Sequence, residues 1–535
     1  MRTARARCRV RRDTRGGAVI TVPVLSAAES GEWDRLARER AKIPSRVLME
    51  SAGRAVAAAV AREYRPRLAS GVLVVCGTGN NGGDGFVAAR ALAALGAGVV
   101  AVALAGEPSD DCRANRELAA AAGVRVIGPD DDWGTCGVVV DALLGTGAKG
   151  APRDATAAAI ERLMRLAAPV VAVDGPSGVD LTTGEVFSPC VRASLTVTFG
   201  GFRRGHLLQR TVCGAVVVAE IGFPPPEAAW PAAVSDAWLK DVLPPLRAEM
   251  HKGDRGRVLV VGGGEGMAGA AIFSAKSAAR SGAGLVKIAA HEASVRAAQA
   301  NNPDLMTVTT ALGETLEPAL AEALQWADAV VVGPGLGRGA ARERFARNVL
   351  GASRGAVLLD ADGLMAFRGC ADELKGLLAG RTALLTPHRG EFAAIFPELA
   401  ERTRRDPFGA AAEAAVVIGA GVLLKGVPTV VAAPHARPLV SASGNPGLAT
   451  GGTGDVLSGM AASWLARGAP PEVAGAAAAW VHGRAAEDVA KHRSVRTLRP
   501  DDLLGVLSPL WRDLEEKPAE PDPPFLVRLE PPAVH

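Results

Sequence analysis

The chain has 535 residues, of which 48% are hydrophobic and 22% are charged, a composition typical of a folded globular protein. Its net charge of +4 is small, and seven arginines lie within residues 1–15, so the remainder is not basic and does not favour nucleic acid as a partner. The longest uncharged, mostly apolar run, Ala91 to Gly106, is too short and too rich in glycine to predict a membrane span.

The seven cysteines are scattered and never spaced C-x-x-C, which argues against a disulfide framework or a zinc site and favours a cytoplasmic location. Residues 1–20 are basic and lack the apolar region of a secretory signal, so we expect a disordered leader. Residues 513–535 are rich in proline and glutamate and predict a loose tail.

Short runs of valine, isoleucine and leucine recur along the first half of the chain, each followed by glycine and then by a helical pattern. Because these runs are continuously apolar, they predict parallel strands that crossover helices bury on both faces. The predicted strands cover 72–77, 99–104, 137–145, 169–178, 194–200 and 215–222. This alternation predicts a doubly wound, Rossmann-like α/β sheet.

Residues 226–250 interrupt the rhythm with prolines and are the predicted linker between two domains. We expect a first domain over 21–225 and a second α/β domain over 251–512, each long enough to bury its own core. The predicted strands of the second domain cover 257–264, 284–290, 329–337, 356–364, 383–388, 421–426 and 429–434.

In the first domain, a glycine-rich loop with unusual polar residues, "CGTGNNGGDGF" (76–86), follows the predicted strand at 72–77. Its Asn80, Asn81 and Asp84 would lie at the carboxyl edge of the sheet, where open α/β folds bind ligands. Their amide and carboxylate groups could bind ribose oxygens, phosphate oxygens or a monovalent cation. The alternative is a polar turn whose asparagines adopt a left-handed conformation.

Two further strands of the first domain end in an acidic residue and a glycine loop. Asp141 lies in "VVVDALLGTGAKG", and Asp174 and Ser177 lie in "VAVDGPSGVD". A single aspartate at a strand end is often only a turn former or a helix cap. Three such loops at one edge of a sheet favour a ligand site.

The motifs "MESAGRAVA", "GNNGGDGFVAAR", "DALLGTG" and "DGPSGVD" make residues 22–225 closely resemble the NAD(P)H-hydrate epimerase domain. The resemblance implies a Rossmann-like fold that interconverts the R and S forms of hydrated NADH or NADPH, with K⁺ near Asn81, Asp141 and Ser177. It implies substrate contacts from Asn80, Asn81, Gly82, Gly83, Asp84, Gly145, Thr146, Gly147, Ala148, Lys149, Gly150, Ala151 and Asp174. Within this domain we assign the acid/base work at the hydrated ring carbon to Asp141.

In the second domain, "GNPGLATGGTGDVLSGM" (444–460) places glycines around one carboxylate, Asp455, before a predicted helix. Free amides at a helix N-terminus bind phosphate, and a carboxylate beside them could take a proton from an attacking hydroxyl. The alternative is a glycine-rich turn that Asp455 caps. Lys425, in "LLKGVPTVV", could meet a nucleotide phosphate or lie exposed in a turn, and His388, in "TPHRGEF", is a candidate substrate contact.

These motifs make residues 235–510 resemble the ADP-dependent NAD(P)H-hydrate dehydratase domain, a relative of ribokinase-type small-molecule kinases. The resemblance implies a ribokinase-like α/β fold in which Gly451–Gly454 bind a transferring phosphoryl group and Asp455 deprotonates the ring hydroxyl. It implies dehydration of the S form to NAD(P)H, with ADP giving AMP and phosphate and with Mg²⁺ bound to the nucleotide. The implied nucleotide contacts are Lys425, Gly426, Val427, Pro428, Thr429 and Gly454, and the implied substrate contacts are Ala271, Gly337, His388 and Asp455.

Together the two resemblances predict one bifunctional repair enzyme, an isomerase joined to a lyase. Its predicted partners are small molecules, hydrated NADH or NADPH and ADP, and we expect a homo-oligomer without nucleic acid or membrane. One alternative is a ribokinase-like small-molecule kinase with an N-terminal ligand-binding module, although a plain kinase has no use for the fused first domain. In another, that first domain is a binding or scaffold module without catalysis.

Overall fold

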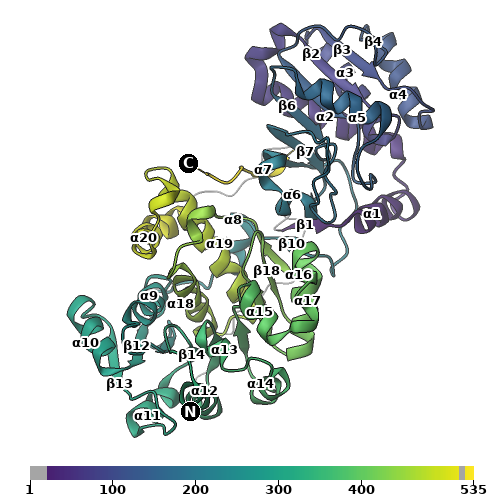
Figure 1. Cartoon of the computed structure of the whole chain (residues 1–535). Helices are drawn as coiled ribbons and strands as arrows, with labels where there is room; N and C mark the ends of the chain where they lie inside the picture. The colour runs from purple at the N-terminus through teal and green to yellow at the C-terminus, as the bar shows by residue number, and fades with distance from the viewer. Residues whose placement is uncertain (1–20, 517–524, 535) are drawn as a thin grey trace. The chain divides into compact units, whose positions relative to one another are not determined.

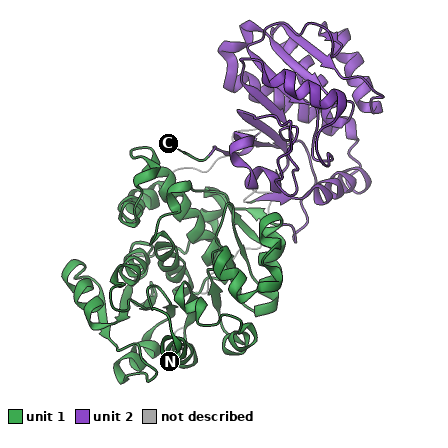
Figure 2. Cartoon of the chain, viewed as in Figure 1, with its two compact units in different colours: residues 1–21, 231–519, 532–535 green, residues 22–230, 520–531 purple. Residues whose placement is uncertain are grey.

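The computed structural model describes residues 21–516 and 525–534 (Figure 1). It divides into two compact units, each built on a mainly parallel sheet with helices, so the predicted α/β class is confirmed (Figure 2). Unit 2 contains residues 22–230 and 520–531, and unit 1 contains residues 231–519 with both chain ends. The predicted leader, residues 1–20, lies outside the described residues.

Unit 2 holds an eight-stranded sheet in the order β20-β9-β7-β6-β5-β2-β3-β4, in which only the β20–β9 pair is antiparallel. Two further strands of unit 2, β1 and β8, lie outside this eight-stranded sheet and pair with each other in parallel. The strands are β1 (Val22–Leu25), β2 (Val72–Cys76), β3 (Val99–Ala103), β4 (Arg125–Ile127), β5 (Val138–Ala142), β6 (Val170–Val173), β7 (Leu195–Phe199), β8 (Phe202–Arg203), β9 (Ala215–Ala219) and β20 (Phe525–Leu529).

Helices cover both faces of this sheet, because alternate residues of its strands enter two different cores. Val72 and Val74 of β2 belong to one apolar cluster, while Leu73 and Val75 belong to the other. The helices of unit 2 are α1 (Ala27–Glu39), α2 (Ser45–Tyr64), η1 (Arg65–Ser70), α3 (Asn80–Ala94), α4 (Asp110–Ala121), α5 (Asp154–Met164), α6 (Arg204–Leu208) and α7 (Arg210–Cys213).

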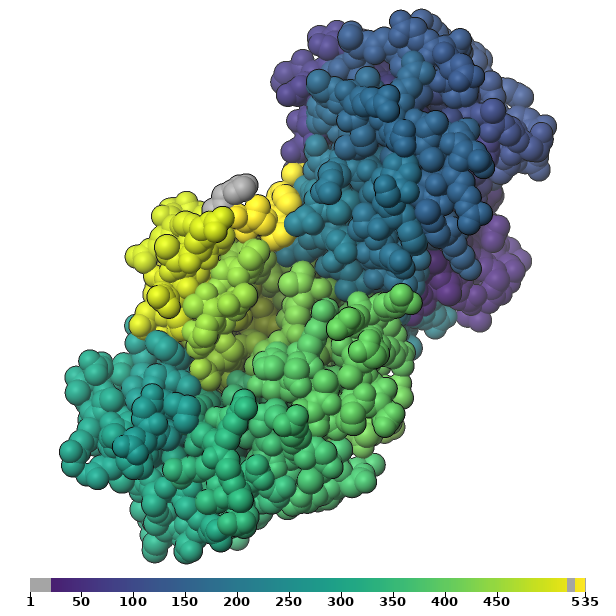
Figure 3. Space-filling view, in the orientation of Figure 1, coloured from purple at the N-terminus to yellow at the C-terminus, as the bar shows by residue number. Residues whose placement is uncertain are grey.

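The expected loose tail over 513–535 is wrong for two of its parts. Helix α20 (Pro500–Glu516) runs into it, and residues 525–529 form β20, which pairs with β9. The apolar run "FLVRL" provides buried side chains at Phe525 and Leu529, and the otherwise open edge of β9 provides the hydrogen-bond partners. In the space-filling view this yellow segment lies against blue residues of unit 2 (Figure 3).

Unit 1 contains strands in the order β13-β12-β11-β14-β15-β16-β17-β18-β19-β10, parallel except at β17–β18 and β18–β19. Part of the predicted linker belongs to this fold, since β10 and the helix after it lie within 226–250. The strands are β10 (Ala232–Ala233), β11 (Arg257–Val261), β12 (Leu285–Ala290), β13 (Met306–Thr309), β14 (Ala329–Val332), β15 (Ala356–Leu359), β16 (Ala383–Leu385), β17 (Gly421–Leu424), β18 (Thr429–Ala432) and β19 (Leu439–Ser441).

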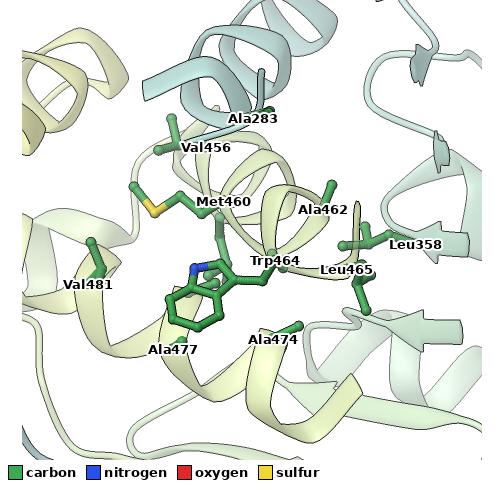
Figure 4. Close-up of a cluster of buried hydrophobic side chains, with 14 of the residues drawn as sticks. Ala283, Leu358, Val456, Met460, Ala462, Trp464, Leu465, Ala474, Ala477 and Val481 are labelled. Carbon is green, nitrogen blue, oxygen red and sulfur yellow. The ribbon is translucent and has the colours of Figure 1, made fainter. Parts of the chain in front are cut away.

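Two helices rich in small residues, α18 and α19, form the centre of the unit 1 core. In Figure 4 the indole of Trp464 on α18 packs against Ala474 and Ala477 of α19, with Met460 beside it. The helices of unit 1 are α8 (Asp236–Val242), α9 (Ala268–Arg280), α10 (Glu292–Asn301), α11 (Pro318–Trp326), α12 (Ala340–Ala352), α13 (Asp362–Met365), α14 (Ala371–Leu378), α15 (Arg389–Ile395), η2 (Pro397–Leu399), α16 (Arg402–Arg405), α17 (Pro407–Ile418), η3 (Pro446–Leu448), α18 (Thr453–Ala466), α19 (Pro471–Ala490), η4 (Val495–Thr497) and α20.

None of the helices in the described parts of the chain has the length and apolar character that crossing a bilayer requires.

Candidate active sites

A cavity of about 730 Å³ opens in unit 2 where loops follow β2, β5 and β6. This is the carboxyl edge of a parallel sheet, as the sequence predicts. The predicted substrate residues that line it are Asn80, Asn81, Asp84, Gly145, Thr146, Gly147, Ala148 and Asp174. Those that do not line it are Gly82, Gly83, Lys149, Gly150 and Ala151.

Asp174 is the best-anchored carboxylate of this cavity. Its side chain forms an ion pair with Arg203 at 3.1 Å and accepts hydrogen bonds from the Thr146 amide at 2.8 Å and from the Thr146 hydroxyl. Burial raises the pKa of Asp174, but the charge of Arg203 and the bonds from Thr146 outweigh it and hold that pKa below its ordinary value. Its backbone has a φ of +65°, a left-handed conformation uncommon for a residue with a side chain.

His206 fixes the turn that carries Arg203. Its Nδ1 accepts a hydrogen bond from the Arg203 amide at 3.0 Å, so its proton lies on Nε2, which faces the Asp174 carbonyl at 2.7 Å. Burial lowers the pKa of His206 to about 4, which keeps the ring neutral. The loop after β6 and the segment at β8 are thereby held together by one neutral histidine and one ion pair.

Asp84 differs from Asp174, although both carboxyl groups line the same cavity. Among the described residues it has no hydrogen-bond or ion-pair partner. Burial raises the pKa of Asp84 well above its ordinary value, and the negative charge of Asp174 raises it further. Asp84 is therefore a carboxyl group that faces a cavity and has a pKa well above its ordinary value.

Asp141 is not among the residues that line this cavity, and its predicted role at the substrate stays a prediction. Asp141 is fully buried, does not line the cavity, and accepts hydrogen bonds from the Ser177 amide at 2.9 Å and from the Ser177 hydroxyl at 2.7 Å. Burial raises its pKa to about 6, and the bonds from Ser177 oppose this rise. The sequence could not show this, because a strand-end aspartate can point into a loop as easily as into a cavity. The hydrogen bonds of Asp141 therefore link the end of β5 to the loop after β6 that contains Ser177.

Two of the three predicted K⁺ ligands are hydrogen-bonded to each other. Asp141 accepts from Ser177, whereas no hydrogen bond joins Asn81 to either of them within the described residues. Asn81 lies instead beside Gly145, where a Cβ would be 3.1 Å from Asn81 Oδ1 and 3.3 Å from Asp174 Oδ2. The missing side chain of Gly145 thus leaves a small space between two oxygens, the ligand type that hard cations take.

In unit 1, Lys425 and Asp360 form a buried ion pair at the carboxyl ends of β17 and β15. Lys425 Nζ lies 2.6 Å from Asp360 Oδ1, and the Ser458 hydroxyl of α18 donates to the other oxygen of Asp360. Burial alone would lower the pKa of Lys425, but the charges of Asp360 and Glu391 raise it above its ordinary value. The Lys425 side chain keeps 20% of its surface exposed, against 2% for Asp360, so the lysine can still meet a ligand.

Asp455 stands in the first turn of α18, next to this ion pair. A Cβ on Gly454 would lie 3.3 Å from Lys425 Nζ, so the helix terminus and the ammonium group converge. Gly452 begins the helix with a φ of +92°, which only glycine adopts without strain. Burial raises the pKa of Asp455 to about 7, Asp360 adds to the rise, and Lys425 opposes it. The described residues provide no hydrogen bond to this carboxyl group.

His388 and Gly337 lie at the edges of the same cluster. His388 caps α15 by accepting from the Gly390 and Glu391 amides at Nδ1, so its proton lies on Nε2 of an exposed ring. The Gly337 amide donates to Asp362 at 2.9 Å. Both Asp362 and Glu391 raise the pKa of Asp455, which places them near it.

The predicted substrate contact of Ala271 is not supported, because its side chain is 1% exposed and lies within the apolar core. Gly426, Val427, Pro428 and Thr429 form the turn between β17 and β18, directly after Lys425. The residues that sequence reasoning missed are Arg203, His206, Asp360 and Ser458. In most of these contacts the partner is more than 20 residues away in the chain, so a local motif does not reveal the contact. The one signal in the sequence was "DADGL" after β15, which contains Asp360.

Residues 45–205 match the family model of the YjeF-related protein N-terminus, and residues 258–508 match the model described as NAD(P)H-hydrate dehydratase. The bifunctional NAD(P)H-hydrate repair enzyme Nnr of Moorella thermoacetica is 36% identical over 521 residues, which cover 92% of this chain and 97% of the relative. The chain belongs to the family of bifunctional NAD(P)H-hydrate repair enzymes. The predicted family is therefore confirmed.

Other members of this repair-enzyme family are similar over most of their length. The Nnr enzyme of Pyrobaculum aerophilum is 39% identical and covers 88% of this chain and 94% of its own. A solved ADP/ATP-dependent NAD(P)H-hydrate dehydratase from Bacillus subtilis, co-crystallised with ATP and Mg²⁺, is 29% identical, with a TM-score of 0.45. It covers 52% of this chain and 98% of its own.

Proposed function

We propose that this chain restores NADH and NADPH from their hydrated forms, with unit 2 as the epimerase and unit 1 as the ADP-dependent dehydratase. Family membership supports the pair of activities and counts against a plain kinase, since both halves of the chain match. The observation that supports the chemistry is that each unit pairs a fixed carboxylate with an unbonded one. Asp174 lies beside Asp84, and Asp360 lies beside Asp455, and in both pairs the fixed charge raises the pKa of the unbonded group.

In the dehydratase unit, the N-terminus of α18 and Lys425 would bind the phosphate groups of ADP. The amides of Gly451 to Gly454 precede or begin this helix, and amides at a helix N-terminus with a positive dipole stabilise negative charge. Lys425 is a compact cation whose partner, Asp360, is also held by Ser458, so the site stays ordered when the lysine turns toward phosphate.

Asp455 would act as the general base of the transfer step. It takes the proton of the ring hydroxyl while the hydroxyl oxygen attacks the terminal phosphorus of ADP, and AMP leaves with the bridging oxygen. The phosphate ester then loses phosphate with the carbon–oxygen electron pair, and the neighbouring ring carbon loses a proton to restore the double bond. A pKa of about 7 suits a base that must be free at neutral pH and still accept a proton.

Mg²⁺ would bind with the nucleotide and neutralise phosphate charge during transfer. No group of three or more His, Cys, Asp or Glu side chains in residues 21–516 and 525–534 is arranged to hold a metal ion. The side chains therefore fit an ion held mainly by phosphate oxygens and water, with Asp360 and Asp362 among the carboxylates whose charge acts on Asp455.

In the epimerase unit, we assign the acid/base role to Asp84 in place of Asp141. Asp84 faces the cavity and its pKa is raised, so in its protonated form it can give a proton to the departing ring hydroxyl, which leaves as water. The electron pair of the ring nitrogen stabilises the resulting cation until water adds to the other face and returns a proton to Asp84. Burial raises the pKa of Asp84, and the charge of Asp174, which Arg203 holds in place, raises it further.

The finer features of the predicted function stay predictions. They are K⁺ at Asn81, Asp141 and Ser177, ADP as the phosphate donor, homo-oligomeric assembly, a cytoplasmic location and the absence of nucleic acid and membrane partners. For K⁺, the space beside Gly145 supports an oxygen-lined site that includes Asn81 and Asp174.

One experiment tests both activities in the full chain. A mixture of known proportions of R and S hydrated NADH is incubated with ADP and Mg²⁺, and the return of reduced-nicotinamide absorbance is followed. Recovery of the whole mixture at the enzymatic rate supports both activities. Parallel samples carry Asp455→Asn or Asp84→Asn, and a sample without protein measures spontaneous exchange of the epimers.

The variants give distinct outcomes in this assay. Asp455→Asn should abolish all recovery, whereas Asp84→Asn should leave fast recovery of the S form and slow the R form to the spontaneous rate. Recovery of only the S form by the unaltered chain would refute epimerase activity. Absence of recovery with either ADP or ATP would refute the dehydratase.

A further inference from the structure

A second cavity, of about 530 Å³, lies in unit 1 away from the proposed catalytic cluster. It is lined by the C-terminal ends of α9 and α18, the second half of α20, and the loop before β11. These three helices pack against one another (Figure 1). Asp455 is in the first turn of α18 and Trp464 in its last, so about two and a half helical turns separate the two sites.

The walls of this cavity carry an excess of positive charge. Arg255, Arg280 and Arg467 line it, with Glu515 as the one carboxylate among its lining residues. Arg280 donates to the Leu504 carbonyl at 2.6 Å, and Arg467 donates to the Pro244 carbonyl at 3.2 Å. Helix α9 ends at Arg280, and α18 ends just before Arg467. Part of the role of these two arginines is therefore to complement the negative ends of the helices.

Arg255 has no such structural explanation. It lies in the loop before β11, not at a helix end, and its Nε is buried without a hydrogen-bond partner. Two more buried polar atoms on the same walls, Ser281 Oγ and Trp511 Nε1, also have no partner. Buried polar groups are nearly always bonded, and a guanidinium or an indole N–H can only donate. The part of the chain that the structure describes provides no acceptor for these three atoms, and Arg255 adds its guanidinium charge to the residues that line the cavity.

The apolar part of the wall indicates the rest of the ligand. Trp511 is half-buried, and Trp464 and Leu243 complete an apolar side. An indole face stacks well on a planar ring, and a base–indole stack is compatible with a neighbouring phosphate–arginine contact. A volume of about 530 Å³ falls within the range of small-molecule sites.

We propose that this cavity is a second ligand site of the chain, specific for a phosphorylated nucleoside of mononucleotide size. The phosphate would accept from Arg255 and Ser281, and the base would stack on Trp511. The proposal does not depend on the repair function, because none of these residues belongs to the catalytic cluster around Asp455.

Photo-labelling of the full chain with 2-azido-AMP, followed by peptide mapping, tests this site directly. We expect label on the peptide that carries Trp511, and protection of that peptide by excess AMP but not by adenosine. Arg255→Gln should weaken protection by AMP at least about tenfold, because it removes a charge-assisted hydrogen bond. The matched control is Arg512→Gln, on the same helix but not lining the cavity, which should leave labelling unchanged.

Labelling confined to unit 2 and to peptides around Lys425 and Asp455 would overturn the proposal. Equal protection by inorganic phosphate and AMP would overturn the nucleoside part, since it would show a site for a simple oxyanion. Because Arg255→Gln could disturb folding, its dehydratase rate must stay within about twofold of the unaltered chain. If the rate changes by more than this, Trp511→Phe takes the place of Arg255→Gln, and we expect the same weakening of protection by AMP.

Discussion

Each unit contains a buried aspartate paired with a basic side chain, which is an arginine in unit 2 and a lysine in unit 1. In each, a buried aspartate is neutralised by one basic side chain, Asp174 by Arg203 at 3.1 Å and Asp360 by Lys425 at 2.6 Å. In each, the fixed charge also raises the pKa of an unbonded carboxyl group nearby. The recurrence in two sheets of different strand order indicates a chemical requirement and not a shared local motif.

The difference lies in the exposure and geometry of the cation. Arg203 is 5% exposed and also donates to the Thr146 hydroxyl, so it serves as a rigid support. Lys425 is 20% exposed and borders the N-terminus of α18, where a phosphate can compete for it. The epimerase site needs side chains that stay in place during a proton transfer. The dehydratase site, in contrast, must admit a highly charged nucleotide.

The largest expected effect is that of Asp455→Asn. Removal of the general base should lower kcat for dehydration of the S form by about 10³-fold, within the usual range for such groups. The measurement is the return of reduced-nicotinamide absorbance at saturating ADP. Epimerisation should be unaltered, and a kcat within tenfold of the parent would show that Asp455 is not the base.

Asp84→Asn should lower the epimerisation rate by about 10²-fold without changing the melting temperature appreciably. Asp141→Asn is its matched partner and should do the reverse. The new amide side chain has one acceptor oxygen fewer for the Ser177 amide and hydroxyl. We therefore expect the free energy of unfolding to fall by about 2 kcal/mol and the Tm to fall by about 4–8 °C. The exchange rate between R and S forms and calorimetry distinguish them. If Asp141→Asn is inactive with an unchanged Tm, the original assignment of acid/base work to Asp141 holds.

The two activities should respond to pH with opposite sign. Asp455 must be ionised to act, so kcat/KM for dehydration should fall about tenfold per pH unit below its pKa of about 7 and level off above it. Asp84 must be protonated to act, so epimerisation should fall as pH rises through its raised pKa. Separate pH profiles with pure S and pure R forms check this. If both rates changed in the same direction with pH, the proposed contrast between Asp455 as a base and Asp84 as an acid would be wrong.

The smallest effects are expected from exchanging the cations. Arg203→Lys keeps a charge for Asp174 but loses the bond from Arg203 Nε to Thr146, which should cost about 1 kcal/mol and lower epimerisation several-fold. Lys425→Arg keeps a charge for Asp360, but the longer side chain should raise the KM for ADP and leave the Tm of the chain nearly unchanged. Equal effects on KM in both units would show that exposure of the cation does not matter.

The fold was predictable because buried parallel strands have a local signature. The runs at 72–77, 137–145 and 257–264 contain β2, β5 and β11, since a strand buried on both faces is apolar at nearly every position. Short edge strands escape this rule. β4 is exposed or half-buried and only three residues long, and β20 lies in a segment rich in proline and glutamate.

By itself, the sequence determined the class of fold, the two-part organisation and the family. It also determined which loops carry the chemistry, because their glycine, aspartate and asparagine residues are close together in the chain at strand ends. It did not determine which aspartate faces a ligand. Asp141 lies near the end of β5 and Asp84 near the start of α3, yet the first is hydrogen-bonded inside the fold and the second lines the cavity. Only the tertiary structure decided this, because burial and the partners Arg203, Asp360 and Ser458 come from elsewhere in the chain and set the pKa of each carboxyl group.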